Sequence, residues 1–164
     1  MPRLALAPAV FTPDEISAVV DLYRTNPGYC RASGEYDPDE VRADQVEADL
    51  REEAEQSEVL LARDPDGRIV GLLCLLPEHP RDGHPWIGLL LVHGDLHGQG
   101  LGRGLAVLAE ERFRTHPSGG LRLAVLENNP SALAFWTALG WREIARRRDV
   151  QHGRPCIVMH RQLA

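Results

Sequence analysis

The stretch His97-Gly98-Gln99-Gly100-Leu101-Gly102-Arg103-Gly104 decides how this chain is interpreted. An apolar run, Trp86–Val92, precedes it, and an amphipathic run that begins at Leu101 follows it. The pattern predicts a strand, a glycine-rich turn and a helix in succession. Glycines allow backbone N–H groups to approach a ligand closely, and the N-terminus of a helix carries partial positive charge. We therefore expect the turn to bind a phosphate or pyrophosphate group.

The spacing of the glycines excludes two common phosphate-binding turns. A dinucleotide fingerprint requires G-x-G-x-x-G, but Arg103 or Leu105 stands where the third glycine would fall. A P-loop requires a lysine, and the sequence contains none. The lack of lysine also excludes a lysine nucleophile and a pyridoxal-phosphate Schiff base.

Two motifs resemble those of the GCN5-related N-acetyltransferase (GNAT) family. The family's cofactor loop, Q/R-x-x-G-x-G/A, is matched by His97-Gly98-Gln99-Gly100-Leu101-Gly102. A second motif, N-x-x-A-x-x-F-Y-x-x-x-G-F, is matched by Asn129 to Trp141, and one expected strand separates the two. The resemblance covers the chain from about Leu60 onward, and before that residue it depends on element order alone.

The resemblance implies acetyl-CoA as co-substrate and no metal. Backbone N–H groups from Gly98 to Arg103 would hold the pyrophosphate, and the Arg103 side chain either adds a contact or is exposed. The pantetheine arm would pair with the strand end at Leu90 and Val92, where that strand separates from the next. Asn129 would either meet the pantetheine amides or cap its own helix. The predicted cofactor-binding residues are Leu90, Leu91, Val92, His97, Gly98, Gln99, Gly100, Leu101, Gly102, Arg103, Asn129 and Trp136.

Two positions depart from the family's pattern. His97 replaces an Arg or Gln, and a neutral imidazole offers at most one hydrogen-bond donor. Trp136 stands where many relatives have the tyrosine that protonates the leaving thiolate. Because an indole is not a useful acid, we expect Trp136 to pack beside the cofactor and water to protonate the thiolate. A backbone N–H near Leu91 would polarise the thioester carbonyl.

The base that would deprotonate the accepting amine is not evident. The strand Trp86–Val92 contains no glutamate, although relatives often carry the base there. Glu127, at the end of a later strand, is the candidate base, and the alternative is that it is an exposed strand-end carboxylate. Further candidates for the base are His84, His93, Asp149 and Tyr36.

Charge and composition restrict the partners. The net charge of −6 argues against nucleic acid. The acidic segment from Asp14 to Glu58 indicates either exposed helix faces or attraction of a small cationic amine. Tyr29 and Tyr36 fall in an expected loop where relatives place acceptor-binding elements, so we predict that they bind substrate. The three arginines at 146–148 are more typical of an exposed strand edge than of a site that binds an acidic acyl donor or acceptor.

The order of predicted elements is β-α-α-β-β-β-α-β-α-β-β, an α/β fold with a mixed sheet in one domain, 1–164. Helices are expected over 12–24, 37–55, 101–115 and 129–140, and strands over 3–9, 58–62, 68–76, 86–92, 121–126, 141–150 and 155–161. No apolar run is long enough to span a membrane. The three cysteines are widely spaced, which is typical of reduced thiols, so we expect a cytoplasmic protein. The C-terminal hairpin is a candidate dimer contact.

These observations together predict an acetyl-CoA-dependent N-acetyltransferase (EC 2.3.1.-) that acetylates a primary amine of a small molecule, or of a protein or peptide, by direct attack in a ternary complex. Two alternatives remain open at this stage. One is a non-catalytic module that binds acyl-CoA as a sensor. The other is a transferase that uses another acyl-CoA.

Overall fold

Seven strands form one mixed sheet in the order β1-β2-β3-β4-β5-β7-β6, as seen in a computed structural model that describes residues 3–163. The strands are β1 (Ala5–Pro8), β2 (Glu58–Arg63), β3 (Ile69–Leu76), β4 (Trp86–Val92), β5 (Gly120–Leu126), β6 (Arg142–Arg148) and β7 (Pro155–Gln162). The helices are α1 (Pro13–Arg24), α2 (Pro27–Ser33), α3 (Ala43–Glu53), α4 (Leu101–Arg112) and α5 (Pro130–Ala138), and a short 3₁₀ turn spans Gly94–Leu96. The predicted α/β class with a mixed sheet is confirmed, and the seven predicted strands occur in the expected sequence along the chain, but helix α2 was not predicted.

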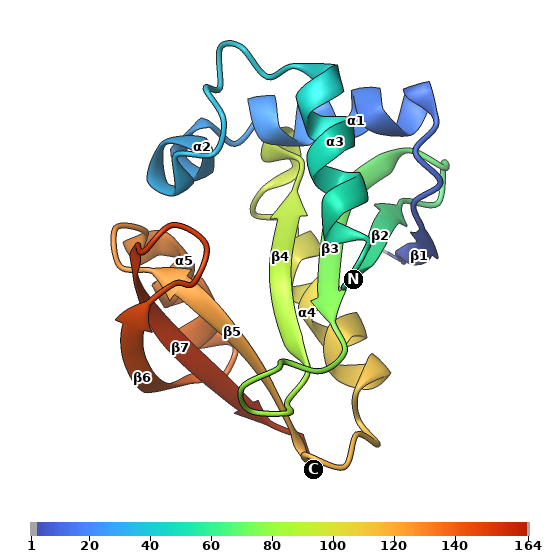
Figure 1. The fold of residues 1–164 in the computed structure, drawn as a ribbon. Coiled ribbons are helices and arrows are strands. Elements are labelled where there is room, and N and C mark those ends of the chain that lie inside the picture. Colours follow the sequence, from blue (N-terminus) through green and yellow to red (C-terminus); the bar gives the residue numbers. More distant parts are fainter. Residues whose placement is uncertain (1–2, 164) are drawn as a thin grey trace.

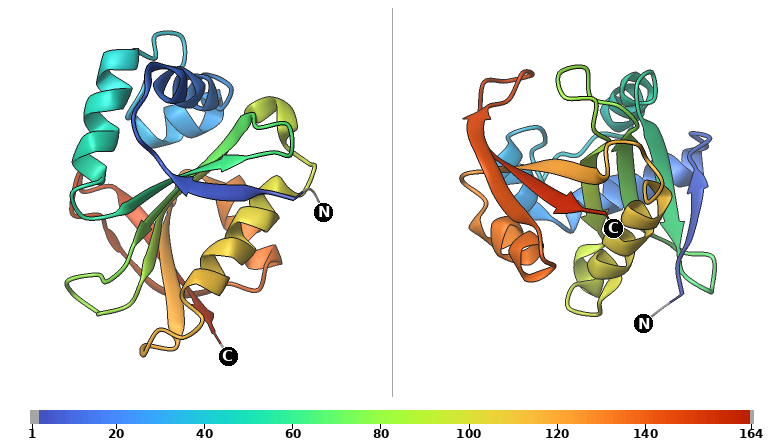
Figure 2. Two further views of the ribbon diagram at one scale, coloured as in Figure 1. Left: turned by 90° about the vertical axis from the view of Figure 1, so that its right-hand side faces the viewer. Right: turned by 90° about the horizontal axis from the view of Figure 1, so that it is seen from below.

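Helices cover both faces of the sheet. Helices α1 and α3 lie on one face and α4 lies on the other (Figure 2). Because side chains alternate along a strand, Leu72 and Leu91 pack with α1 and α3, whereas Leu73 and Ile87 pack with α4 and α5. Two apolar layers therefore hold the sheet between the helices.

Strands β4 and β5 are joined only at one end. Their parallel pairing consists of Trp86 opposite Arg122 and Ile87 opposite Leu123. Beyond these pairs the two strands diverge (Figure 1). Gly88 is an extra residue in β4, because Ile87 faces Leu75 and Leu89 faces Cys74, and such a bulge bends a strand. The expected separation of the two strands is confirmed.

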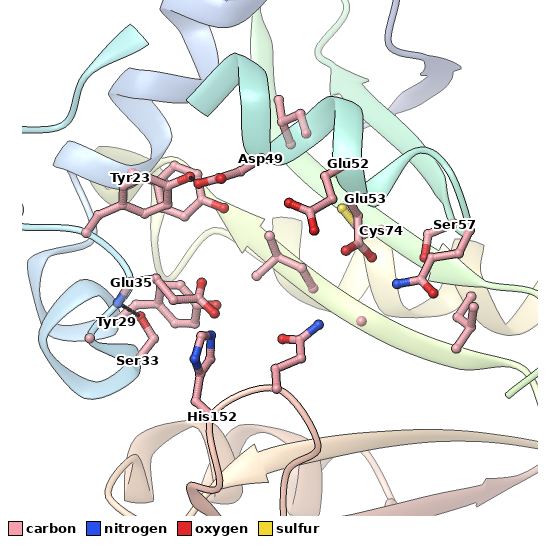
Figure 3. Close-up of a pocket in the computed structure, with 18 of the residues that line it drawn as sticks. Tyr23, Tyr29, Ser33, Glu35, Asp49, Glu52, Glu53, Ser57, Cys74 and His152 are labelled. Carbon is pink, nitrogen blue, oxygen red and sulfur yellow. Dashed lines mark hydrogen bonds between the residues drawn. The ribbon is translucent and has the colours of Figure 1, made fainter. Parts of the chain in front are cut away.

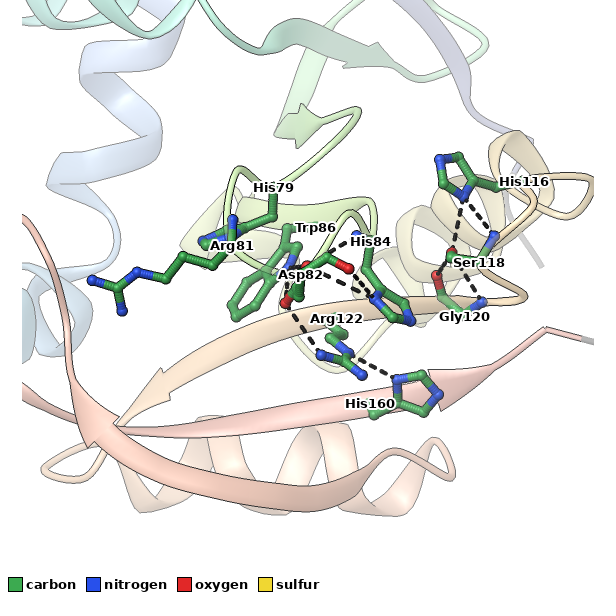
Figure 4. A network of polar contacts seen from close by, with 10 residues as sticks. All are labelled: His79, Arg81, Asp82, His84, Trp86, His116, Ser118, Gly120, Arg122 and His160. Atoms are coloured by element: carbon green, nitrogen blue, oxygen red, sulfur yellow. Dashed lines mark hydrogen bonds and ion pairs between the residues drawn. The ribbon is translucent and has the colours of Figure 1, made fainter.

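A polar network holds the joined end of β4 and β5 (Figure 4). The carboxylate of Asp82 accepts hydrogen bonds from Trp86 Nε1 and Arg122 Nη1, each at 3.2 Å. Arg122 Nε donates to Nδ1 of His160 on β7 at 3.2 Å. The backbone N–H of His84 also donates to Asp82, at 2.9 Å. We call Asp82, His84, Trp86, Arg122 and His160 the clamp, since they connect β4, β5 and β7 below the divergence.

The N-terminal third differs from the sequence prediction in two places. The helix expected from Asp37 begins only at Ala43, because Asp37 caps a turn in which its carbonyl accepts from Glu40 N–H. The segment expected to be a loop around Tyr29 is partly helix α2, which Gly34 ends with a φ of 72°. Helix α1 ends before Asn26-Pro27-Gly28 as predicted, but because proline is compatible with the first position of a helix, the same residues also start α2.

The middle of β4 is also less buried than the sequence predicts. The continuous apolar run predicts a fully buried strand, but Gly88 is exposed and Leu89 and Leu90 are only half-buried. These three residues border the space left where β4 and β5 diverge. The three cysteines are free and buried, as expected. Among residues 3–163, no helix is both long enough and apolar enough to cross a bilayer.

Candidate active site

A cavity of about 910 Å³ lies between the N-terminus of α4, the end of β4 and the start of α5, and we call it the loop cavity. Gly98 and Gly100 have φ values of 81° and 83°, a conformation that favours glycine, and each faces open space. Within residues 3–163, the N–H groups of Leu101, Gly102 and Arg103 have no acceptor, because the first helical bond is donated by Gly104 N–H. Three free N–H groups at a helix N-terminus suit an anion such as a pyrophosphate.

Gly102 serves a different purpose from its neighbours. A Cβ at this position would lie 3.2 Å from the Phe135 ring, which is tighter than most such contacts. Glycine at 102 therefore permits α4 to pack closely against α5. The sequence motif alone does not distinguish this packing role from contact with a ligand.

The loop cavity brings together the predicted cofactor-binding residues, with one exception. Its lining includes Leu90, Leu91, Val92, His97, Gly98, Gly100, Leu101, Gly102, Arg103, Asn129 and Trp136, but not Gln99. Asn129 caps α5, since its Oδ1 accepts from Ala132 N–H at 3.2 Å. The structure also adds Asn26 to this lining, which sequence reasoning missed.

The end of β4 is held by side chains. The carbonyl of Val92 accepts from Asn26 Nδ2 at 2.8 Å and lies 3.1 Å from His97 Nε2. Leu90 and Leu91 lie before this point, beyond the last pair that β4 makes with β5. The part of β4 that is available to an extended ligand is therefore centred on Leu90 and Leu91 rather than on the Val92 carbonyl.

A second cavity of about 380 Å³, the gap cavity, lies between the diverging parts of β4 and β5. It is lined by Gly88–Leu90 on one strand and Leu123–Leu126 on the other. Trp136 closes one side. Its ring is 7% exposed and packs edge-on against Phe135 and Trp141, with centroids 4.9 and 5.1 Å away. These contacts agree with a packing role for Trp136.

A third cavity of about 940 Å³, the acidic cavity, lies beside α2 and α3 (Figure 3). Its carboxylates are Glu35, Asp49, Glu52 and Glu53. Tyr36, one of the two predicted substrate residues, lines this cavity and donates a hydrogen bond to Asp49. Sequence reasoning identified the acidic segment as a whole but not these carboxylates, because a charge run does not show which side chains share a cavity.

Shared residues connect the three cavities. Tyr29 lines all of them, and within the described part of the chain it is the only residue that does. Burial raises the pKa of Tyr29, so its hydroxyl stays protonated at neutral pH. Glu35 lines both the gap and acidic cavities and is the only described carboxylate common to these two. A path therefore leads from the loop cavity past Tyr29 to the acidic cavity.

Glu127 lies elsewhere. Its side chain is exposed, Arg146 Nη1 is 3.4 Å from its Oε1, and it is not among the described residues that line the three cavities. Its role as the base is untested and stays a prediction.

The other candidates for the base have structural partners. His84 belongs to the clamp, and Nδ1 of the buried His93 accepts from Asp95 N–H at 3.2 Å. Asp149 accepts from Arg154 Nε at 2.6 Å, and Tyr36 donates to Asp49. Arg154 Nη1 also donates to the Ser33 carbonyl at 2.8 Å, so it ties the C-terminal hairpin to the end of α2.

Comparison with known proteins identifies the family. The model of the acetyltransferase (GNAT) family matches residues 17–141. An acetyltransferase from Thermus thermophilus is 27% identical and superimposes with a TM-score of 0.75, covering 99% of this chain and 100% of its own. A search of curated protein sequences finds no match.

Two solved structures with named acceptors share the fold at lower identity. One is spermidine N-acetyltransferase from Vibrio cholerae in complex with CoA and spermine (15% identity, TM-score 0.70, covering 98% of this chain and 95% of its own). The other is the ribosomal-protein-S18-alanine N-acetyltransferase from Escherichia coli (16% identity, TM-score 0.67, covering 99% of this chain and 95% of its own).

Proposed function

The chain belongs to the GNAT acetyltransferase family, and from that premise we propose that it transfers an acetyl group from acetyl-CoA to a primary amine of a small molecule. The observation that carries the proposal is the path formed by the three cavities, with Tyr29 common to all of them. One end of the path offers free helical N–H groups for a pyrophosphate, and the other is lined by carboxylates that suit a cationic amine.

The residues around the loop cavity would hold the co-substrate. Free N–H groups at Leu101, Gly102 and Arg103 would bind the pyrophosphate, and the Arg103 side chain would add a charge-assisted contact. The unpaired part of β4 at Leu90 and Leu91 would bind the pantetheine arm as an added strand does. Acetyl-CoA supplies the acetyl group as a thioester, which an unprotonated amine attacks while the coenzyme A thiolate leaves.

Glu35 is the carboxylate best placed to remove a proton from the amine. It lines both cavities through which the amine would approach the thioester, whereas Glu127 lies outside them. Arg154 Nη1 is 3.6 Å from Glu35 Oε1, and this ion pair orients the carboxylate where the two cavities meet. Glu127 remains the candidate predicted from sequence.

The indole of Trp136 cannot protonate a thiolate, so this role falls to Tyr29 or to water. Tyr29 is the only described residue that lines all three cavities, but burial raises its pKa and so makes its hydroxyl a weaker acid than that of a free tyrosine. A coenzyme A thiolate is a stable leaving group, so an acid contributes less here than a base.

The acidic cavity supports a small cationic amine as acceptor, and the spermidine N-acetyltransferase from Vibrio cholerae is an example of the same fold with such an acceptor. An N-terminal alanine, as in the ribosomal-protein enzyme, is the second candidate acceptor. A thiol-release assay with acetyl-CoA and a panel of amines and peptides tests the proposal. Release that depends on an amine supports an enzyme, whereas binding of acetyl-CoA without release by any amine would indicate a sensor module.

A further inference from the structure

The acidic cavity contains carboxylates that the protein does not neutralise. Four line it, Glu35, Asp49, Glu52 and Glu53, against one guanidinium, that of Arg154. Arg154 is already engaged by Asp149 at 2.6 Å and Glu35 at 3.6 Å. Within residues 3–163, no Arg or His lies within 4 Å of the other three carboxylates. The cavity therefore has net negative charge, and the C-terminal end of α3, which closes with Glu53, adds partial negative charge.

The carboxylate of Glu53 lies beside Gly88. Its Oε1 lies 3.6 Å from the position that a Cβ on Gly88 would take, and Gly88 is the bulged residue of β4. Gly88 lines both the gap and acidic cavities. The half-buried carboxylate of Glu53 has no hydrogen bond or ion pair to a described residue, although a partly desolvated carboxylate is stabilised by a cation.

The hydroxyl of a buried tyrosine opens onto the same cavity. Tyr23 is only 4% exposed and lines the acidic cavity, and its hydroxyl has no hydrogen-bond partner in the described part of the chain (Figure 3). The hydroxyl of this buried side chain reaches the cavity surface without a partner among the described residues, so it can bond a polar group of a ligand. Burial raises the pKa of Tyr23, and the neutral hydroxyl can accept a hydrogen bond from an ammonium group.

We infer that the acidic cavity selects an acceptor with at least two amino groups, a linear diamine or polyamine, and that Glu53 is the main determinant of this selectivity. The reacting amine lies near Glu35 and Tyr29, where the acidic and gap cavities meet. The second, protonated amine lies between Glu52 and Glu53, in the cavity that the Tyr23 hydroxyl also lines. This inference rests on the proposed function and narrows its substrate class.

The test compares 1,4-diaminobutane with 1-aminobutane, which has the same carbon chain but one amine. We expect a kcat/KM for the diamine at least about tenfold higher, the size of effect that one partly buried ion pair produces. The Glu53→Gln variant keeps the shape of the side chain and removes its charge, so the preference should fall to about twofold or less. Glu55→Gln is the matched control, because Glu55 is exposed just beyond α3 and outside the acidic cavity, and this variant should keep the preference.

A second readout does not depend on turnover. Calorimetric titration of 1,4-diaminobutane into the protein with coenzyme A present should show binding that weakens in Glu53→Gln and with added salt. If Glu53→Gln fails to fold, as judged by circular dichroism, Glu52→Gln provides the same comparison. Equal kcat/KM values for the two amines would overturn the inference, as would an unchanged preference in Glu53→Gln.

The failures of the two proposals are distinguishable. If acetyl-CoA binds and a peptide or monoamine is acetylated without preference for diamines, the substrate inference alone is wrong. If acetyl-CoA neither binds nor releases thiol with any acceptor, the proposed function is wrong and the substrate inference fails with it.

Discussion

Trp86 lies directly opposite Arg122, and the carboxylate of Asp82 accepts a hydrogen bond from each of these side chains at 3.2 Å. This pair is one of only two described residue pairs that join β4 to β5. The contact therefore fixes the point from which the strands diverge, and the gap cavity begins just above it. The few residues that stabilise the clamp therefore also set the shape of the gap cavity.

Replacing Asp82 by Asn should destabilise the fold. The substitution removes a charge-assisted acceptor from Arg122 and leaves a partly buried guanidinium with weaker partners, at a cost of about 1–3 kcal/mol. Urea denaturation would measure the free energy of unfolding, with Asp66→Asn in an exposed turn as the control. A loss in Asp82→Asn no larger than in Asp66→Asn would show that the clamp contributes little.

Stability should decline between pH 7 and pH 5. Burial lowers the pKa of His160 and of His79 below 6.5, so the unfolded chain takes up these protons at a higher pH than the folded one. Their stabilising contribution is complete above about pH 6.5 and is lost as the pH falls toward the folded pKa values. We expect a steady fall in Tm over this range that becomes shallower in His160→Gln. A variant whose Tm follows the same pH curve as the wild type would contradict this assignment.

Glycine at position 100 should be required for acetyl-CoA binding. An Ala at this φ of 83° is strained by about 1–2 kcal/mol, and relief of that strain would turn the free N–H groups of α4 away from the loop cavity. We expect Gly100→Ala to weaken acetyl-CoA binding at least about tenfold, or about 1.4 kcal/mol. Gly67→Ala is a matched control, since Gly67 also has a φ of 83° and open space but lies in the β2–β3 turn. Equal binding by both variants would exclude the loop cavity as the pyrophosphate site.

The base can be identified by comparing two isosteric variants. Glu35→Gln should lower kcat at neutral pH by about 10²–10³-fold and remove the acidic limb of the pH–rate profile, as expected for a general base. Glu127→Gln should change kcat less than about threefold, because Glu127 is exposed beside Arg146 and outside the cavities. Steady-state kinetics from about pH 6 to about pH 9.5 would decide between them. A large loss in Glu127→Gln alone would restore the assignment made from sequence.

The sequence predicted the strands and the loop at His97–Gly104 well, because glycines, caps and apolar periodicity are local signals. Helix α1 begins at Pro13 and ends at Arg24, as its cap signals indicate. The two helices after it were harder to predict, since Pro27 and Asp37 each fit both a helix start and a turn.

The residues that line the loop cavity could be predicted from the sequence more fully than those that line the acidic cavity. The loop cavity is built largely from two contiguous motifs, so its residues are visible in the sequence. The acidic cavity instead combines Tyr23, Glu35 and Glu53 with Gly88 and Arg154, which are far apart in the chain. Only the fold brings these residues together, and no local pattern reveals that Glu53 lies over the bulge in β4.

Calorimetric titration of acetyl-CoA into the purified protein tests the central claim most directly. The arrangement of the loop cavity predicts one site per chain with a Kd in the micromolar range, about −8 kcal/mol, and competition by coenzyme A. A titration that shows no binding at an acetyl-CoA concentration of about 1 mM, which corresponds to a free energy weaker than about −4 kcal/mol, would contradict the account.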